Sequence, residues 1–454
     1  MSRPSDLTAR LRKVDKAHLW HPFTQMADWV ADDPVVIASG EAEFIVDTEG
    51  NRYIDGVSSL WCNLHGHRRA EIDEAIRRQL ERIAHSTLLG LASPPSIKLA
   101  ERLIALVPDG LSRVFYSDSG ATAVEIALKM AFQYWRQCSP PRPEKTKFVG
   151  LTLGYHGDTV GAVSVGGIDT FHGLYRPLLF DTIHAPAPYC YRCPLGKTRE
   201  DCGLACATRM EEILSAHGDH VAAVILEPLV QGAGGMIVHP DGYLRRADDA
   251  CRANDVLLIC DEVATGFGRT GRMFACEHEG VRPDFLCLAK GISGGYLPLA
   301  ATLTTERVYE AFLAGANRTF FHGHTYTGNA LACAAGLASL DVFEKEDVLA
   351  RIGQLAERLA GLLEPLGKMP HVGEVRQKGL MVGVELVADR ETRRAYGSDE
   401  RRARRACVAA RKHGVWVRPL GDVVVLMPPY CISDESLERL VAGVREGIAE
   451  ATEA

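Results

Sequence analysis

The chain lacks the features that would connect it with a membrane, a secretory route or a nucleic acid. None of its apolar runs is long enough to span a bilayer. Its opening segment, MSRPSDLTARLRKVDKAHLW, has no apolar stretch of the kind a secretory signal needs. A formal net charge of −7 gives no overall positive field to attract nucleic acid or anionic lipid. We therefore expect a cytoplasmic protein that acts on small molecules.

Internal repeats and low-complexity linkers are also missing, so a solenoid or a string of small modules is excluded. The chain has 454 residues, of which 46% are hydrophobic and 24% charged, as in ordinary globular proteins. This length exceeds the usual size of a domain with a single hydrophobic core, which indicates two domains. Most of the thirteen cysteines are scattered through apolar runs, which favours a reducing compartment over a disulfide framework.

Short apolar runs alternate with helical patterns from about residue 68 to residue 344. Helices are expected at 72–84 and 122–135, and strands at VFYSDSG, KFVGLTLGYHG, VAAVILEP, DVLLICDE and DFLCLAKG. This alternation predicts an α/β domain with a doubly wound, mostly parallel sheet.

Beyond residue 344, a charged helical stretch precedes two strand-like segments, GLMVGVELV and DVVVLMPP, which predicts a smaller α+β domain. Near the N-terminus, EAEFIVDTEGNRYIDG has the pattern of a β-hairpin. We expect residues 1–65 to pack with the small domain, residues 66–345 to form the large domain, and residues 346–454 the small one.

Lys290 and Asp261 each follow an apolar run that is typical of a buried parallel strand. Ligands of such sheets lie at the carboxyl ends of the strands, so an amine and a carboxylate would meet in one crevice. Pyridoxal phosphate (PLP) requires this pair, a lysine that binds its aldehyde and an acid beside its pyridine nitrogen. A lone lysine after a strand is usually a solvated surface residue, so the assignment depends on the surrounding motifs.

Two further segments supply groups that suit such a coenzyme. SDSGATAVEIALKMAFQYW places Gly120 and Ala121 at the start of a strong helix, where free N–H groups attract phosphate; the alternative is an ordinary capped helix. GYHGDT places Tyr155 at the end of a strand, where its ring would stack on a pyridine, or would belong to a simple turn.

One glutamate, two arginines and one threonine have less specific surroundings. Glu227 ends the run VAAVILE, and we expect it to pair with Arg269 of GFGRTGRMF so that neither charge is left alone. Arg418, in GVWVRPLGD, is suited to clamp a substrate carboxylate, or else to form a surface ion pair. Thr325, in FHGHTYTGN, is a candidate phosphate ligand.

A cysteine cluster interrupts the α/β pattern at PYCYRCPLGKTREDCGLACA. Cys190 and Cys193 form a C-x-x-C pair, and Cys202 and Cys206 follow closely. Four thiolates at this spacing fit a structural zinc or an iron–sulfur centre. The alternative is a loop of free, partly buried thiols.

Taken together, these motifs resemble the class III aminotransferases among the fold type I PLP enzymes, over nearly the whole chain. DEVATGFGRTG followed by LAKGISGGYLPLA carries most of the resemblance. HLWHPFTQM, SSLWCNLHGH, GYHGDT, MFACEH and GVWVRPLGD are closest to the branch that aminates 8-amino-7-oxononanoate in biotin biosynthesis. The resemblance implies the fold type I architecture and ping-pong transamination, in which one site accepts the amino donor and the acceptor in turn.

The resemblance also implies roles for single residues. Lys290 would be the PLP-binding lysine and catalytic base, Asp261 the partner of the ring nitrogen, and Tyr155 a neighbour of ring and substrate. The phosphate would be bound by Gly120 and Ala121 and, from the neighbouring subunit of a homodimer, by His324 and Thr325. The substrate contacts would come from Phe23, Trp61, Tyr155, Lys290, Gly323 and Arg418.

Two positions depart from the pattern of relatives that use S-adenosylmethionine as amino donor. They usually carry HPYT and HGPT, where this chain has HPFT with Phe23 and HGHT with His324. Both changes resemble the branch that uses lysine, so the donor is either S-adenosylmethionine or lysine. Other class III activities on ω-amino acids or diamines, and a non-catalytic binding protein with the same fold, are the remaining alternatives.

Overall fold

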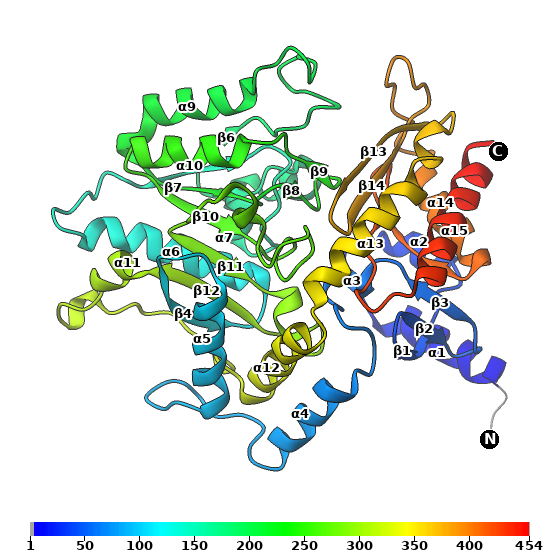
Figure 1. Cartoon of the computed structure of the whole chain (residues 1–454), viewed down its shortest axis with the longest axis horizontal. Coiled ribbons are helices and arrows are strands. Elements are labelled where there is room, and N and C mark those ends of the chain that lie inside the picture. Colours follow the sequence, from blue (N-terminus) through cyan, green and yellow to red (C-terminus); the bar gives the residue numbers. More distant parts are fainter. Residues whose placement is uncertain (1–3, 454) are drawn as a thin grey trace.

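The computed structural model of the chain describes residues 4–453. A larger body holds a central sheet, and a smaller body holds two four-stranded sheets; the helices α12 (Ala330–Lys345) and α13 (Val348–Leu363) connect the two (Figure 1). In the part of the chain described, no helix is both long and apolar enough to cross a membrane.

The seven-stranded central sheet has the order β4-β12-β11-β10-β7-β5-β6. Neighbouring strands are parallel from β11 to β6, whereas β12 runs antiparallel to both of its neighbours. This confirms the predicted α/β class and the mostly parallel sheet. The strands are β4 (Leu111–Ser117), β5 (Lys147–Leu151), β6 (Thr182–Ala185), β7 (Val221–Leu226), β10 (Leu257–Asp261), β11 (Phe285–Leu288) and β12 (Ala300–Thr305).

Both faces of this sheet are buried, because successive side chains of a strand point to opposite sides. In β10, Leu257 and Ile259 belong to the apolar cluster that includes helix α6 (Gly120–Gln137), while Leu258 and Cys260 belong to the main core cluster. The other helices of the large body are α4 (Ala70–Leu80), α5 (Pro94–Leu106), α7 (Val160–Val165), α8 (Asp169–His172), α9 (Ala205–His217), α10 (Tyr243–Ala253) and α11 (Glu306–Glu310). Because both faces of the sheet are buried, the sequences of its strands are continuous apolar runs rather than alternating ones.

The smaller body combines segments from the two ends of the chain. One sheet has the order β1-β2-β3-β15, in which β3 (Arg52–Asp55) pairs in parallel with β15 (Val415–Trp416); β1 (Ile37–Glu41) and β2 (Phe44–Asp47) complete it. The predicted hairpin is β2 and β3. The other sheet is antiparallel and consists of β13 (Val372–Lys378), β14 (Met381–Leu386), β17 (Val423–Leu426) and β16 (Arg418–Leu420). Helix α14 (Arg402–Ala410) packs against this sheet, and α15 (Asp434–Glu453) packs against α14. The domain limits remain predictions.

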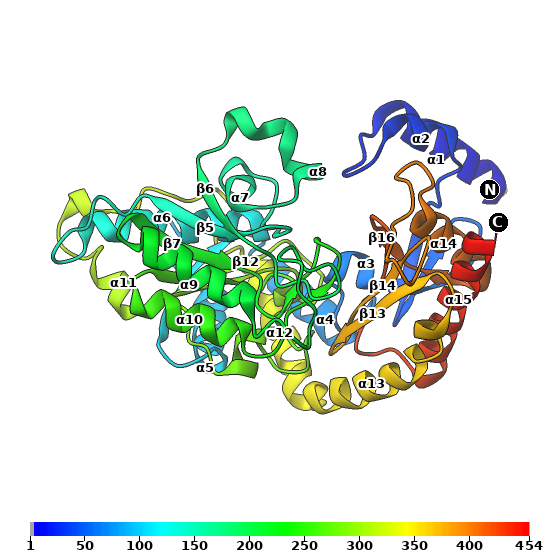
Figure 2. The same ribbon diagram turned by 90° about the horizontal axis from the view of Figure 1, so that it is seen from above.

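The N-terminal helices α1 (Pro4–His18) and α2 (Met26–Ala31) lie at the outer edge of the smaller body. In Figure 2 the chain between them extends toward α8 of the larger body. The short helix α3 (Ser58–Trp61) lies between the bodies.

Candidate active site

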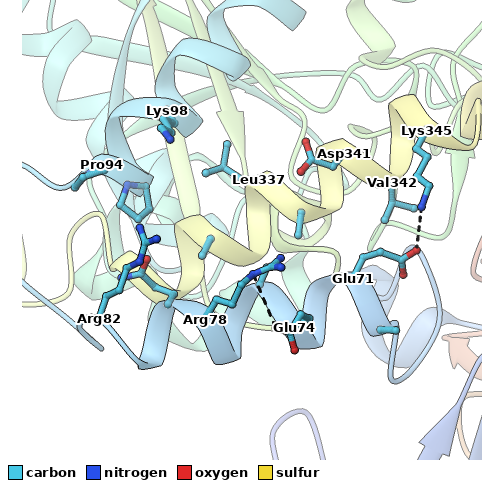
Figure 3. A pocket seen from close by; sticks show the side chains of 16 residues that line it. Glu71, Glu74, Arg78, Arg82, Pro94, Lys98, Leu337, Asp341, Val342 and Lys345 are labelled. Carbon is cyan, nitrogen blue, oxygen red and sulfur yellow. Dashed lines mark ion pairs between the residues drawn. The ribbon is translucent and has the colours of Figure 1, made fainter.

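Among the cavities formed by residues 4–453, two of nearly equal volume have linings that differ in chemistry. The first, of about 740 Å³, lies between α4, α5 and α12 (Figure 3). Its charged side chains pair with one another on the surface, as Arg78 does with Glu74 and Lys345 with Glu71. The second, of about 720 Å³, contains Lys290 and Asp261 and is the candidate active site.

Lys290 is separated from the end of β11 by Ala289 alone and begins a short 3₁₀ turn (Lys290–Ser293). Its backbone has a φ of 43°, an uncommon conformation for a residue other than glycine, and one that concentrates at functional sites. The Nζ atom lies 5.2 Å from the centre of the Trp61 ring, and both residues line the cavity. Desolvation lowers the pKa of Lys290, which increases the fraction of neutral amine.

Asp261 closes β10, and its buried carboxylate is fixed from two sides. One oxygen accepts a hydrogen bond from the backbone N–H of Val263 at 3.1 Å, and the other lies 2.7 Å from Nδ1 of the buried His156. Within the described residues 4–453, the Nε2 atom of His156 is buried without a hydrogen-bond partner. The sequence motif GYHGDT, in which His156 follows Tyr155, assigns His156 no role, and its position beside Asp261 is visible only in the fold.

The start of helix α6 lies at the same cavity. Ser119 caps the helix and exchanges hydrogen bonds with Thr122 in a capping box. Gly120 and Ala121 follow directly and line the cavity. Since the first backbone N–H groups of a helix have no intrahelical acceptor, this corner is suited to an anion such as phosphate.

Tyr155 and Glu227 also line the cavity. The backbone N–H of Tyr155 donates to Glu227 at 3.0 Å, and its hydroxyl donates to Asp158 at 2.7 Å. Burial, together with the hydrogen bond to Asp158, raises the pKa of Tyr155. Burial raises the pKa of Glu227 to about 7.

The expected pair of Glu227 with Arg269 is wrong. Glu227 accepts two backbone N–H groups, from Tyr155 and from Gly232, whereas Arg269 donates to the carbonyl oxygen of Pro428. Both residues could be placed near the crevice from the sequence. That backbone N–H groups bind the carboxylate of Glu227 could not be predicted from it.

The cavity lining therefore contains Lys290, Asp261, Gly120, Ala121, Tyr155 and Trp61. It does not include the other residues that were expected at the site, which are Phe23, Gly323, His324, Thr325 and Arg418.

Phe23 and His324 lie next to the lining. The Phe23 ring is 62% exposed, packs edge to face against Tyr155 at 6.4 Å between ring centres, and comes from the segment that extends toward α8 (Figure 2). His324 Nε2 lies 3.9 Å from a carboxylate oxygen of Asp118. Arg418 is exposed on β16 of the smaller body and forms no ion pair within residues 4–453.

The comparisons with known proteins decide the family. The sequence model of the class III aminotransferases matches residues 26–447. The chain belongs to the class III aminotransferases. This aminotransferase is 60% identical, over 448 residues, to a relative from Nitratidesulfovibrio vulgaris named adenosylmethionine-8-amino-7-oxononanoate aminotransferase; the match covers 98% of this chain and 83% of the relative.

Solved structures agree with this aminotransferase over nearly its whole length. A crystal structure of adenosylmethionine-8-amino-7-oxononanoate aminotransferase from Methanocaldococcus jannaschii has a TM-score of 0.93 and 45% identity, with 97% of this chain and 99% of that chain covered. An amine transaminase from an uncultivated Pseudomonas species, in its PLP-bound form, has a TM-score of 0.90 and 40% identity, with 95% and 98% covered. These similarities confirm the fold type I class.

The predicted zinc or iron–sulfur centre of the aminotransferase finds no support. Across residues 4–453, no three His, Cys, Asp or Glu side chains converge in a way that could hold a metal ion. Cys206 is buried at the start of α9, and desolvation raises the pKa of its thiol to about 11. Desolvation also raises the pKa of the Cys190 thiol. The alternative fits better, because Cys190, Cys193, Cys202 and Cys206 are all free thiols and three of them are partly exposed.

Proposed function

We propose that this aminotransferase transfers an amino group to 8-amino-7-oxononanoate, giving 7,8-diaminononanoate, with PLP as coenzyme. The observation that carries the proposal is the full-length similarity to relatives that bear this activity in their names, at 60%, 53% and 54% identity in three bacteria. The free state of all thirteen cysteines supports a cytoplasmic location.

The residues of the cavity fit PLP. Lys290 would hold the coenzyme covalently, the N–H groups at Gly120 and Ala121 would bind its phosphate, and Asp261 would hold a proton on its ring nitrogen. When bound, PLP supplies the electron sink that transamination requires. The cavity thus offers a lysine for the aldehyde of PLP, a buried carboxylate for its ring nitrogen and a helix N-terminus for its phosphate.

Each residue then has a defined task in the reaction. Lys290, whose pKa is lowered by desolvation, is able as a neutral amine to take a proton from the donor carbon and return it to the acceptor. Asp261 would pair with the ring nitrogen, and His156 holds its carboxylate in place through the 2.7 Å contact. Tyr155 limits the space beside the reacting atoms, with its hydroxyl fixed by Asp158.

The acceptor would lie between the two bodies. Trp61 lines the cavity next to Lys290, so its indole is placed to contact the aliphatic chain of 8-amino-7-oxononanoate. Arg418 is exposed and free to form a bidentate pair with the acceptor carboxylate. Gly323 has open space around it, since an added Cβ would meet only Thr327, at 4.0 Å, and so leaves room for a ligand.

We further propose a homodimer in which the loop of Gly323, His324 and Thr325 completes the phosphate site of the neighbouring subunit. Phe321 in this loop is 82% exposed and Leu89 is 88% exposed. The two segments lie side by side, because His85 Nε2 is 2.8 Å from the carbonyl oxygen of Thr325. Exposed apolar side chains on adjacent loops are typical of a surface that another protein covers.

For the amino donor we propose S-adenosylmethionine, the donor in the relatives' names, with lysine as the second candidate. Phe23 favours lysine, because its ring, near Tyr155, has no hydroxyl to bond to a donor. The test is a half-reaction followed by absorbance: PLP-loaded protein is mixed with each donor, and then with 8-amino-7-oxononanoate. If the proposal is right, one of the two donors converts the bound PLP to its amine form, and 8-amino-7-oxononanoate converts it back to PLP.

The same experiment separates the alternatives. Return of the coenzyme by pyruvate but not by 8-amino-7-oxononanoate would assign a general amine transaminase, as in the Pseudomonas neighbour at 40% identity. Failure of every donor to convert the bound coenzyme would favour a non-catalytic binding protein.

A further inference from the structure

Asp55 is a fully buried carboxylate at the end of β3, and it lies outside the lining of the active-site cavity. Its ion-pair partner within residues 4–453 is His67, whose Nε2 atom lies 3.0 Å from one carboxylate oxygen. Burying a carboxylate is unfavourable unless its oxygens are hydrogen-bonded, so the groups that it binds indicate what it does there.

Asp55 binds the backbone and the side chain of Ser59. One carboxylate oxygen accepts the backbone N–H of Ser59 at 2.7 Å, and the other accepts its hydroxyl at 2.9 Å. Ser59 belongs to α3, which lies between the two bodies (Figure 2). Below, residues 58–63 are called the Trp61 turn, and Asp55 is therefore a direct anchor of this turn.

The Trp61 turn needs anchors because its backbone is strained. Ser58, Ser59 and Trp61 have φ values of 49°, 62° and 66°, which non-glycine residues rarely adopt. Residues in such conformations persist where surrounding contacts hold them. Asp55 binds the middle one of these three residues.

Both ends of the Trp61 turn are also held. At its start, the hydroxyl of Ser58 donates to the carbonyl oxygen of Met427 at 2.7 Å. At its far end, a Cβ added to Gly295 would lie 2.7 Å from the carbonyl oxygen of Cys62, so the turn packs tightly against the loop that follows Lys290. With its ends fixed, the turn depends on Asp55 for the orientation of its centre.

A change in that orientation would move the Trp61 indole. A Cβ added to Gly232 would lie 3.1 Å from the indole, which leaves the ring little free space on that side. The ring centre also lies 5.2 Å from Lys290 Nζ. The position of the indole in the cavity is therefore sensitive to the backbone of the turn.

His67 braces Asp55 from the N-terminal sheet. Its backbone N–H donates to the carbonyl oxygen of Ala42 at 2.7 Å, and the N–H of Ala42 donates back to it at 3.0 Å. A Cβ added to Gly40, in β1, would lie 2.7 Å from Cγ of the imidazole. These contacts fix the ring beside the carboxylate, which limits the movement of Asp55.

We propose that Asp55, braced by His67, is a positioning residue: by binding Ser59 it holds the strained Trp61 turn and so fixes the Trp61 indole beside Lys290, where it shapes the acceptor pocket. The part of this inference that concerns the acceptor rests on the proposed function. The part that concerns the turn does not.

The test compares Asp55→Ala, which removes the hydrogen bonds to Ser59, with Asp55→Asn, which keeps an oxygen for the Ser59 N–H. The first readout is the rate at which iodoacetamide labels Cys62 in the PLP-loaded protein, measured by peptide mass spectrometry. Cys62 is suitable because its thiol lies 3.8 Å from the carbonyl oxygen of Ser58, inside the turn. Cys138, a partly exposed thiol at the end of α6, is the internal reference. The second readout is the KM for 8-amino-7-oxononanoate.

We expect Asp55→Ala to label Cys62 at least fivefold faster than the wild type and to raise the acceptor KM about tenfold. Asp55→Asn should stay within about twofold of the wild type in both readouts. Trp61→Ala should raise the same KM, and adding Asp55→Ala to it should raise the KM less than twofold further, because both changes act through one indole. His67→Ala should accelerate Cys62 labelling about threefold.

The matched control is Asp47→Ala in the same sheet. Asp47 is a buried acid at the end of β2 that accepts the backbone N–H groups of Glu49 and Asn51 at 2.9 Å and 2.8 Å, outside the cavity lining. Its loss should lower the melting temperature, as the loss of Asp55 does, and leave Cys62 labelling and the acceptor KM unchanged. Equal acceleration of labelling in Asp47→Ala would mean that any weakening of this sheet frees the turn, and would overturn the inference.

Four other results would also overturn it: wild-type labelling of Cys62 in Asp55→Ala, no rescue in Asp55→Asn, KM effects that combine in full with Trp61→Ala, or, for the part assigned to His67, wild-type labelling in His67→Ala. If the wild type does not use 8-amino-7-oxononanoate, the proposed function fails, and the labelling results still decide the role of Asp55. Should Asp55→Ala not fold, Ser59→Ala removes only the hydroxyl contact and is expected to accelerate Cys62 labelling at least twofold; labelling at the wild-type rate would again contradict the proposal.

Discussion

Gly120 offers the sharpest test of how the coenzyme site is built. A Cβ added at this position would lie 2.6 Å from Cγ1 and 3.0 Å from Cγ2 of Val263. Alanine suits the helical backbone better than glycine, so the effect of Gly120→Ala must come from this clash. Overpacking of this kind costs about 1–3 kcal/mol.

The clash can be relieved only by moving groups that line the cavity. Either the start of α6 moves, or Val263 moves, and the N–H of Val263 is the group that holds one oxygen of Asp261. We therefore expect Gly120→Ala to weaken PLP binding by about tenfold, which corresponds to about 1.4 kcal/mol, and to lower the melting temperature. The assay is titration of the coenzyme-free protein with PLP, with thermal unfolding measured in parallel.

Two further variants make this prediction specific. Val263→Ala removes both clashing methyl groups, so the double variant Gly120→Ala/Val263→Ala should regain most of the lost PLP affinity. Gly361→Ala, on α13, is the matched control, because an added Cβ there meets nothing within 4 Å. Wild-type affinity in Gly120→Ala, or a double variant no tighter than Gly120→Ala alone, would refute the reasoning.

The remaining predictions concern one buried acid and two proposed substrate contacts. Because burial raises the pKa of Glu227 from 4.5 to about 7, the folded protein binds an extra proton between these values, and its stability should fall by up to about 3 kcal/mol as the pH rises through this range. Glu227→Gln should remove that dependence, seen as a melting-temperature difference from wild type that grows between pH 5 and pH 8; a constant difference would contradict it. Arg418→Ala should raise the KM for 8-amino-7-oxononanoate at least tenfold and leave the half-reaction with an amine donor nearly unchanged, whereas equal losses would make Arg418 structural. Phe23→Tyr restores a hydroxyl at the mouth of the cavity and should shift donor preference toward S-adenosylmethionine, measured as the ratio of half-reaction rates with the two donors; an unchanged ratio would remove Phe23 from donor selection.

Much of the site could be predicted because strand ends are readable from the sequence. Lys290 and Asp261 each follow an apolar run, and parallel strands bring such positions to one edge of a sheet. Gly120 and Ala121 could be placed for a similar reason, since a capped helix start is a local pattern.

Contacts between distant charged groups could not be predicted. Phe267 and Gly268, with φ values of 57° and 92°, turn the loop so that Arg269 points to Pro428 rather than to Glu227. The orientation of a loop depends on the packing of the whole fold, which no short motif encodes. The zinc alternative finds no support for a related reason, because the spacing of Cys190 and its neighbours does not determine where their sulfur atoms lie in the fold.

The most direct measurement for the whole account is the site at which PLP becomes attached. The purified protein is loaded with PLP, reduced with borohydride, digested and analysed by peptide mass spectrometry, with Lys290→Ala treated in the same way. The account predicts one modified peptide, carrying the added group on Lys290, and no stoichiometric modification in the variant. Attachment at another lysine, or equal attachment in Lys290→Ala, would contradict it.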